Sequence, residues 1–214
     1  MENIADIRKD YKLKSFYESD AAANPIDQFT KWWDEAVKAE IEEVNAMTLA
    51  TASIDAKPSA RIVLLKGYSK EGFIFFTNYQ SAKGQAISTN HNVALLFFWK
   101  ELERQIRIEG IAEKIAASDS DAYFNSRPGG SKIGAWASPQ SEVIPNRAFL
   151  EKNIEDLTAK YQDDNLIPRP ENWGGYIVTP NLIEFWQGRS SRLHDRLQYS
   201  LIENGEWKRE RLAP

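Results

Sequence analysis

The sequence contains no cysteine, and its 214 residues include only two histidines. Without cysteine the chain forms no disulfide and has no thiolate nucleophile. His91 and His194 stand far apart, and neither belongs to a Cys, His, Asp or Glu cluster at the spacing of a zinc site. We therefore expect no metal centre.

Long apolar runs are absent as well. No stretch approaches the roughly 18 residues of a membrane-spanning helix, and the charged beginning of the chain lacks the apolar region of a signal peptide. The net charge of -4 is not that of a general nucleic-acid or membrane-surface binder. These absences predict a cytoplasmic protein that binds neither nucleic acid nor membrane.

Several well-known catalytic and nucleotide-binding motifs are missing. The chain has no G-x-x-x-x-G-K-[ST] loop, no G-x-G-x-x-G, no G-x-S-x-G and no H-E-x-x-H. Hydrolase and nucleoside-triphosphatase functions therefore lack support in the sequence.

The composition is that of an ordinary globular protein, with 42% hydrophobic and 12% aromatic residues. Residues 1–24 are polar and lack sustained periodicity, which predicts a flexible arm. Because no later stretch looks like a linker, we expect residues 25–214 to form a single domain.

Hydrophobic periodicity predicts one long helix followed mainly by strands. The helix begins at Pro25 with Asn24 as its N-cap. Its expected apolar stripe consists of Ile26, Phe29, Trp33, Val37, Ile41 and Val44. Strands are predicted at 46–53, 59–66, 72–78, 92–100, 102–114, 174–180, 182–188, 192–202 and 206–212.

Helices are predicted at 81–90, 118–127, 131–138 and 146–161, with a break at Pro128. The strands do not alternate regularly with helices. We therefore expect a mainly β fold, an antiparallel barrel with peripheral helices, rather than a doubly wound sheet.

Positive charge is concentrated in residues 186–196, WQGRSSRLHDR. In an extended segment Arg192, His194 and Arg196 share one face, and Asp195 points to the other. A row of donors without an acid indicates a bound anion. The alternative is a solvated edge strand whose charges discourage aggregation.

A second candidate anion site lies around Pro128. A helix places Tyr123 and Arg127 one turn apart, and Ser131 is positioned to cap the helix that follows the break. The first N–H groups of that helix would also attract an anion. The alternative is a plain capping serine beside a solvated arginine.

Two further segments carry weaker signals. Arg61 and Lys66 are five residues apart, which puts them on opposite faces of a regular strand or on either side of a bulge. Thr77 ends a predicted strand, and Lys83 lies early in a predicted helix. The residues alone thus indicate a small barrel with several phosphate-binding sites and leave the ligand open.

These segments, in this order, carry a family resemblance. The motifs RIVLLK, ERQ, YFNSRP, IGAWAS followed by Q and S, WGG, IEFWQG and RLHDR resemble the pyridoxamine 5′-phosphate oxidase family. The match runs from about Ile7 to the terminal RLAP. It implies an FMN-binding split β-barrel, assembled as a homodimer with FMN at the subunit interface.

The activity that the resemblance implies is FMN-dependent oxidation of pyridoxamine or pyridoxine 5′-phosphate by O2. The products would be pyridoxal 5′-phosphate, hydrogen peroxide and, from the amine, ammonia, in vitamin B6 biosynthesis and salvage. Two alternatives remain: a phenazine-type oxidase on the same barrel, and a non-catalytic carrier of flavin or pyridoxal phosphate.

Site residues follow from the same resemblance. It implies that FMN contacts Arg61, Ile62, Val63, Leu64, Leu65, Lys66, Phe76, Thr77, Lys83, Gln105, Gln140, Ser141, Trp186 and Arg196. The implied substrate-binding residues are Arg8, Tyr11, Lys66, Tyr123, Arg127, Ser131, Arg192 and His194. Of these, Arg192 and His194 would be catalytic, and residues 8–11 would be a mobile segment that closes the site.

Two positions depart from the family pattern. Ala82 stands where the family commonly has an arginine before Lys83, which predicts weaker FMN retention. The arm reads KSFYESD in place of an arginine-rich stretch, so a product-inhibition site built on those arginines is not expected.

Overall fold

A computed structural model describes residues 3–6 and 9–214. Its centre is a nine-stranded antiparallel sheet with the order β2-β1-β5-β6-β7-β4-β3, and β8 and β9 extend from β7. The strands are β1 Ala46–Ala52, β2 Pro58–Leu64, β3 Gly67–Ser69, β4 Gly72–Asn78, β5 Asn92–Trp99, β6 Arg104–Lys114, β7 Trp173–Gln187, β8 Asp195–Leu201 and β9 Trp207–Leu212. This confirms a mainly β, antiparallel fold with peripheral helices.

The helices lie outside the sheet. They are α1 Pro25–Lys38, α2 Ala82–Thr89, α3 Ala117–Asn125, α4 Gly129–Ala137 and α5 Arg147–Lys160. Short 3-10 turns are η1 Ile4–Asp6, η2 Lys100–Leu102, η3 Asp164–Leu166 and η4 Ser190–Arg192. No helix in the described part of the chain is long and apolar enough to cross a membrane.

Strand β7 joins the two parts of the sheet. It pairs with β6 along its length, with β4 through its first half and with β8 through its second. Two strands were predicted here, and the structure has one. A register shift at Glu109 and Gly110 lets Asn181 be bypassed, so this turn-forming residue is absorbed as a bulge and the strand continues.

The first helix begins as predicted and buries Ile26 and Phe29 as predicted, but the rest of its buried face is rotated from the predicted stripe. The Asn24 side chain accepts a hydrogen bond from the backbone N–H of Ile26 at 2.8 Å. The helix ends at Lys38, so Ile41 and Val44 lie beyond it, and the buried residues include Trp32 and Ala36. The predicted position Val37 is 49% exposed.

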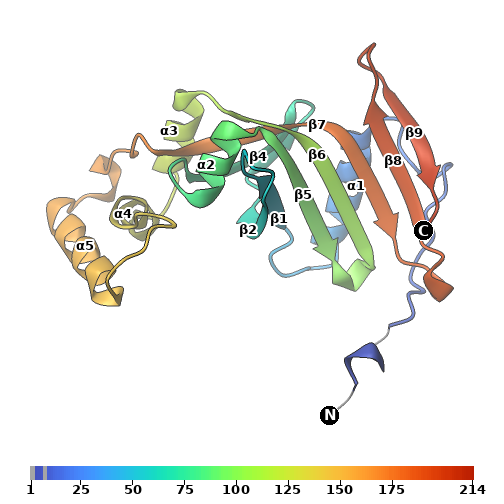
Figure 1. The fold of residues 1–214 in the computed structure, drawn as a ribbon, viewed down its shortest axis with the longest axis horizontal. Coiled ribbons are helices and arrows are strands. Elements are labelled where there is room, and N and C mark those ends of the chain that lie inside the picture. The colour runs from blue at the N-terminus through green and yellow to red at the C-terminus, as the bar shows by residue number, and fades with distance from the viewer. Residues whose placement is uncertain (1–2, 7–8) are drawn as a thin grey trace.

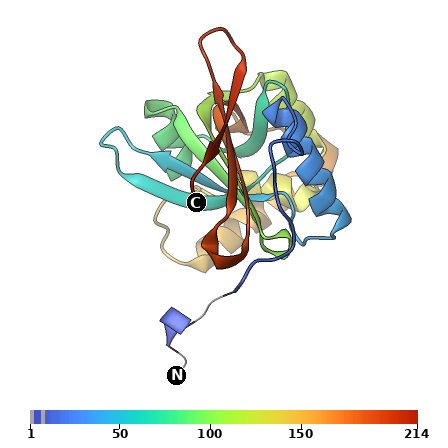
Figure 2. The same ribbon diagram turned by 90° about the vertical axis from the view of Figure 1, so that its right-hand side faces the viewer.

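The N-terminal arm explains this rotation. Phe16 is 3% exposed, and its ring lies 5.0 Å from that of Trp32, so the arm covers a helix face that its own sequence did not reveal. Figure 2 shows this segment passing between α1 and the hairpin of β8 and β9. Downstream, the Tyr199 hydroxyl donates to the carbonyl of Ala22 at 2.7 Å. The flexibility of residues 1–24 and the single domain of 25–214 stay predictions.

Two apolar clusters organise the molecule. The larger lies between the sheet and α1, and the smaller contains Phe124, Ile133, Ile167 and Trp173 beneath α3 and α4. Figure 1 shows α4 and α5 at one end of the long axis and the hairpin of β8 and β9 at the other. The candidate site residues are distributed between these two ends.

Candidate functional site

A cavity of about 710 Å³ lies where β2, β4, α2, α3 and α4 meet. We call it the cation cavity because four basic side chains and no carboxylate line it. The lining residues are Arg61, Ile62, Val63, Leu64, Lys66, Phe76, Thr77, Lys83, Tyr123, Arg127, Pro128, Ser131, Gln140 and Trp173. A concave site with one sign of charge attracts anions strongly.

Arg61 and Lys66 line the same cavity, although an unbroken strand would have separated them. The strand ends at Leu64, after which the Leu65 N–H donates to the carbonyl of Asn45 and the Lys66 N–H to that of Ile74, both at 2.8 Å. The side chain of Leu65 enters the core at 4% exposure. The chain therefore turns between the two cations, and Leu65 does not face the cavity.

The Arg61 guanidinium is held by neutral groups. Its Nη1 donates to the Thr51 hydroxyl at 2.8 Å and the Leu49 carbonyl at 3.2 Å, and its Nη2 to the Ser59 hydroxyl at 2.7 Å. Burial lowers its pKa. Because no acid in the described part of the chain pairs with this group, its charge remains available to a ligand.

Lys83 is oriented in a similar way. Its ammonium donates to Gln140 Oε1 at 3.0 Å and to the Thr77 hydroxyl at 3.3 Å. Burial and then the charge of Arg61 lower the pKa of Lys83. An anion placed between Arg61 and Lys83 would relieve their repulsion.

Arg127 has a buried nitrogen, Nη1, without a hydrogen-bond acceptor among the described residues. The guanidinium lies 4.5 Å from the Trp173 ring centroid, and burial lowers its pKa. Since buried donors are nearly always satisfied, this nitrogen can accommodate an acceptor from a ligand or a water molecule.

Aromatic rings and a helix turn complete this region. The rings of Phe76 and Tyr123 stack with centroids 3.9 Å apart, and Trp173 lies parallel to both. The prediction that Ser131 caps α4 is wrong. Pro128 precedes the first turn and Ser131 lies within it, because the helix begins two residues earlier, at Gly129.

A second cavity, of about 530 Å³, lies at the other end of the molecule. Its lining comprises Lys9, Asp10, Tyr11, Arg189, Ser191, Arg192 and His194. The prediction that Arg192, His194 and Arg196 share a strand face is wrong. Ser191 and Arg192 have φ of 55° and 61°, so the chain turns there and β8 begins only at Asp195.

His194 is oriented by the backbone. The Arg189 N–H donates to its Nδ1 at 3.1 Å, which leaves Nε2 to carry the proton of the neutral ring. Its ring lies 4.5 Å from that of Trp186 and 6.0 Å from that of Tyr11. Burial and then the charge of Arg192 lower the pKa of His194, which favours the neutral form.

Arg196 lies in a row with two other predicted residues. Gln105 is opposite Trp186 in the sheet register, and Trp186 is opposite Arg196. The Arg196 Nε donates to Glu184 at 2.6 Å, and this contact raises the pKa of Arg196. The predicted absence of an acid beside Arg196 is therefore wrong: the acid comes from the neighbouring strand β7.

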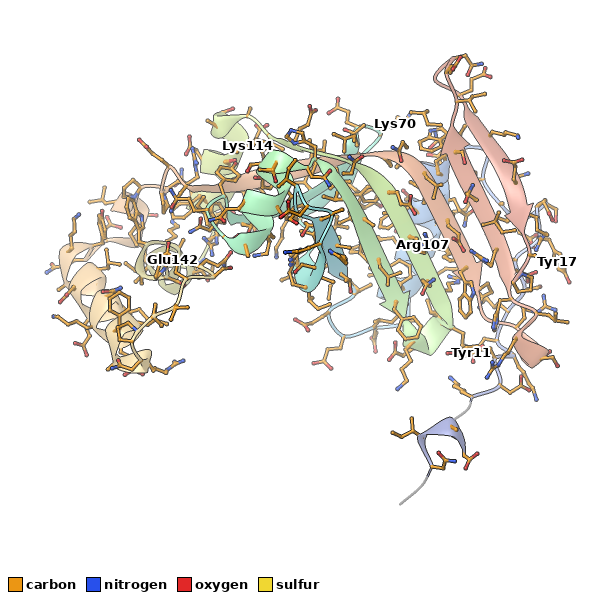
Figure 3. The ribbon with its side chains drawn as sticks, viewed as in Figure 1. Tyr11, Tyr17, Lys70, Arg107, Lys114 and Glu142 are labelled. Atoms are coloured by element: carbon orange, nitrogen blue, oxygen red, sulfur yellow. The ribbon has the colours of Figure 1, made fainter. Side chains whose placement is uncertain are left out.

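One chain does not bring the two groups of residues together. Tyr11 lines the second cavity, and Figure 3 shows it far along the molecule from Glu142, which follows α4. Gln140 lines the cation cavity, whereas Ser141, with φ of 76°, does not. Arg8 lies outside the described residues.

Sequence reasoning did not assign roles to Trp173 and Glu184. Trp173 lines the cation cavity, and Glu184 binds both Arg107 and Arg196. Trp173 begins the motif WGG, where an aromatic residue before two glycines was the available signal. Glu184 lies in IEFWQG, where the signal was a single acid in an apolar strand. Ala82 is exposed at the start of α2, and its effect on FMN stays a prediction.

Comparisons with known proteins agree over the whole chain. The family model described as "Pyridoxamine 5'-phosphate oxidase" matches residues 33–161, and "Pyridoxine 5'-phosphate oxidase C-terminal dimerisation region" matches 173–214. Curated relatives named pyridoxine/pyridoxamine 5′-phosphate oxidase include one from Salinibacter ruber, 54% identical over all of both chains. Another, from Acaryochloris marina, is 56% identical and covers 99% of this chain and 96% of its own.

Solved structures show the same fold. PhzG from Burkholderia lata 383, in complex with tetrahydrophenazine-1-carboxylic acid, is 30% identical with a TM-score of 0.88, covering 94% of this chain and 99% of its own. An FMN-binding protein from Nostoc punctiforme is 16% identical with a TM-score of 0.71, covering 90% of this chain and 100% of its own.

Proposed function

The chain belongs to the pyridoxamine 5′-phosphate oxidase family, and we propose that it oxidises pyridoxamine or pyridoxine 5′-phosphate to pyridoxal 5′-phosphate. The proposed electron acceptor is O2, with hydrogen peroxide as product and ammonia released from the amine. The cation cavity supports this proposal most directly, because it is lined by four basic groups and no acid.

The residues present fit FMN. A phosphate monoester needs unneutralised donors, which Arg61 and Lys83 supply, and both are already oriented by neutral hydrogen-bond partners. When bound, FMN would accept a hydride from the substrate and pass the electrons to O2. Thr77, Gln140 and Phe76 line the same cavity and complete the proposed contacts from this chain.

The substrate phosphate is assigned to the other side of the cavity. Arg127 with its unpaired Nη1, Lys66, Tyr123 and Ser131 all line it. Two phosphorylated ligands held in one cavity are fixed relative to each other, and such orientation contributes much of the rate in reactions between two bound molecules.

A second copy of the chain completes the proposed site. Tyr11, Arg192 and His194 line the second cavity, which shares no lining residue with the cation cavity. The region that matches the C-terminal dimerisation model, 173–214, contains β7, β8 and β9, which carry Trp186 and Arg196. We infer that one protomer provides the cations and its partner provides the row Gln105, Trp186 and Arg196 with the Arg192 loop.

In this arrangement Arg192 and His194 face the pyridine ring. Arg192 forms no ion pair among the described residues, so its charge is free to orient the ring and stabilise negative charge on it. The Nε2–H of neutral His194 donates a hydrogen bond to the substrate, because Nδ1 is occupied by the Arg189 N–H.

A phenazine oxidase is the second candidate, since PhzG shares the fold at 30% identity. The ligand named in that complex is a carboxylic acid without a phosphate. The unpaired Arg127 and the neighbouring Lys66, Tyr123 and Ser131 favour a phosphorylated substrate in this chain.

Anaerobic addition of pyridoxamine 5′-phosphate to the FMN-loaded protein tests the proposal. We expect the yellow colour to bleach in proportion to substrate, and to return on admission of O2 with hydrogen peroxide formed. A colour that persists would contradict the oxidase and support a carrier or a different substrate. Pyridoxamine without its phosphate is the matched control and should bleach the protein far more slowly.

A further inference from the structure

Glu103 belongs to the ERQ motif, in which only Gln105 has an assigned role. It lies between η2 and β6, is 2% exposed and has φ of 54°. A buried carboxylate in left-handed backbone is uncommon, and such conformations persist where the surrounding contacts enforce them. Glu103 therefore calls for a structural explanation.

The carboxylate of Glu103 holds the N-terminal arm. Its Oε2 accepts the backbone N–H groups of Lys12 at 2.9 Å and Leu13 at 3.1 Å, and the Lys9 ammonium lies 3.4 Å from Oε1. These three residues flank Tyr11 on both sides. Two N–H groups donated to one charged oxygen make a strong and directional anchor.

The backbone of Glu103 holds the loop that faces the arm. Its carbonyl accepts the Gly188 N–H at 2.7 Å and the Gln187 Nε2 at 3.3 Å, at the end of β7. The loop of Arg189, Ser191 and Arg192 begins immediately after this point. One residue thus binds both walls of the second cavity, the arm by its side chain and the loop by its main chain.

Tyr11 is packed between these two walls. A Cβ atom at Gly188 would approach the Tyr11 ring to 2.7 Å, so the ring lies directly against the backbone there. On its other sides the ring is 5.8 Å from Trp186 and 6.0 Å from His194. The position of Tyr11 relative to His194 therefore depends on the distance that Glu103 fixes between arm and loop.

The rest of the arm is anchored separately. The Phe16 N–H donates to Asp195 at 3.0 Å, and Arg211 binds the Phe16 carbonyl and Glu18. Nearer Tyr11, Asp10 accepts from the backbone of Ser191, at an exposed position. Loss of the Glu103 carboxylate would thus release residues 9–13 while Phe16 stays in place.

We propose that Glu103 is a positioning residue that fixes Tyr11 against His194 and so closes the substrate side of the site. The inference rests on the proposed function for its effect on turnover, but its structural part does not. Glu103 acts through Tyr11 and the 189–192 loop and need not touch the substrate.

Limited trypsin digestion of the FMN-loaded protein measures the release of the arm. In Glu103→Ala we expect cleavage after Lys12 to be about tenfold faster than in the wild type, followed by intact mass, because local opening governs such cleavage. The KM for pyridoxamine 5′-phosphate should rise about tenfold, as expected for loss of a charge-assisted anchor. The FMN dissociation constant and kcat should change less than about twofold.

Three further variants make the result specific. Glu103→Gln keeps an acceptor oxygen but loses the charge and the Lys9 ion pair, so its trypsin sensitivity and KM should lie between those of the wild type and Glu103→Ala. Glu103→Asp keeps the charge but shortens the side chain, so it should show the same changes as Glu103→Ala in weaker form, even if the alanine variant does not fold. Glu101→Ala removes an exposed acid two residues away and is the matched control.

Equal trypsin sensitivity and KM in Glu103→Ala and Glu101→Ala would overturn the positioning role. A rise in trypsin sensitivity without a change in KM would overturn the link to substrate closure. Because digestion needs no substrate, a wild-type protein that fails to oxidise pyridoxamine 5′-phosphate would refute the proposed function and leave the digestion result to decide the role of Glu103.

Discussion

The two ends of the molecule both concentrate basic side chains, and they use the charge differently. In the cation cavity Arg61, Lys83 and Arg127 contact hydroxyls, amides and aromatic rings. At the other end Arg196 binds Glu184, and Arg211 binds both Glu18 and Asp195. A basic side chain in a cavity without a neighbouring carboxylate indicates a site for an anionic ligand. A basic side chain that pairs with a carboxylate contributes to the structure of the protein.

Arg192 differs from Arg196 and Arg211 at the second end, since it forms no ion pair among the described residues. We expect Arg192→Met to lower kcat by about 100- to 1000-fold, the range for loss of a group that stabilises developing charge. FMN content, read from the visible spectrum, should stay within twofold of the wild type. Steady-state peroxide release gives kcat, and normal turnover would remove Arg192 from the chemistry.

Asp195 tests the paired charges. It accepts from the Phe16 N–H and from the guanidinium groups of Arg189 and Arg211. Asp195→Ala would leave Arg189 without its acid, Arg211 with Glu18 alone and the Phe16 N–H without its acceptor, and we expect the free energy of unfolding to fall by about 3 kcal/mol in urea titration. The exposed Asp55→Ala is the control, expected within about 0.5 kcal/mol of the wild type. Equal stability of the two variants would mean that the pairs do not stabilise the fold.

Arg127 tests the unpaired charges. Arg127→Met keeps much of the stem that packs on Trp173 and removes the donors, so we expect KM for pyridoxamine 5′-phosphate to rise about 30-fold. Oxidation of phosphate-free pyridoxamine, measured in the same assay, should be affected less than about threefold. An equal loss with both substrates would show that Arg127 does not bind the phosphate.

The pH dependence of FMN binding tests Lys83 with a smaller expected effect. Only the protonated ammonium attracts a phosphate, and burial with Arg61 nearby lowers the pKa of Lys83. Binding is therefore strongest below that lowered pKa and weakens as the pH rises through it, by up to about tenfold in dissociation constant. Fluorescence titration across this range should show the change, and Lys83→Gln should flatten it. Identical profiles would exclude Lys83 as the titrating group.

The sequence predicted the strands and helices well where their signals are local. The N-cap at Asn24 and the strand at 72–78 agree with the structure because capping and alternation depend on neighbouring residues. Long-range contacts decided the rest. The Phe16 contact that rotates the buried face of α1, and the bulge that makes β7 continuous, involve partners far away in sequence.

The site was predictable as a set of residues and less so as a geometry. The family resemblance implied most of the cavity residues, and the structure brings twelve of the positions implied for FMN or substrate into one cavity, among them Arg61 and Lys66. Arg196 in β8 pairs with Glu184 in the neighbouring strand β7. Side-chain alternation along one strand cannot reveal such a partner, so it wrongly predicted an Arg196 without an acid. Likewise, Ser191 and Arg192 adopt left-handed backbone although neither is a glycine, so the sequence gives no signal of this turn.

The separation of the cation cavity from the Tyr11 and His194 end has a consequence for inheritance. In a cell with two differently damaged alleles, one lacking Arg127 and one lacking Arg192, the subunits would mix at random. Under the shared-site proposal a mixed dimer concentrates both defects in one site and leaves its other site intact. Two alleles that are each inactive alone should therefore complement each other partially, whereas two lesions at the same end should not.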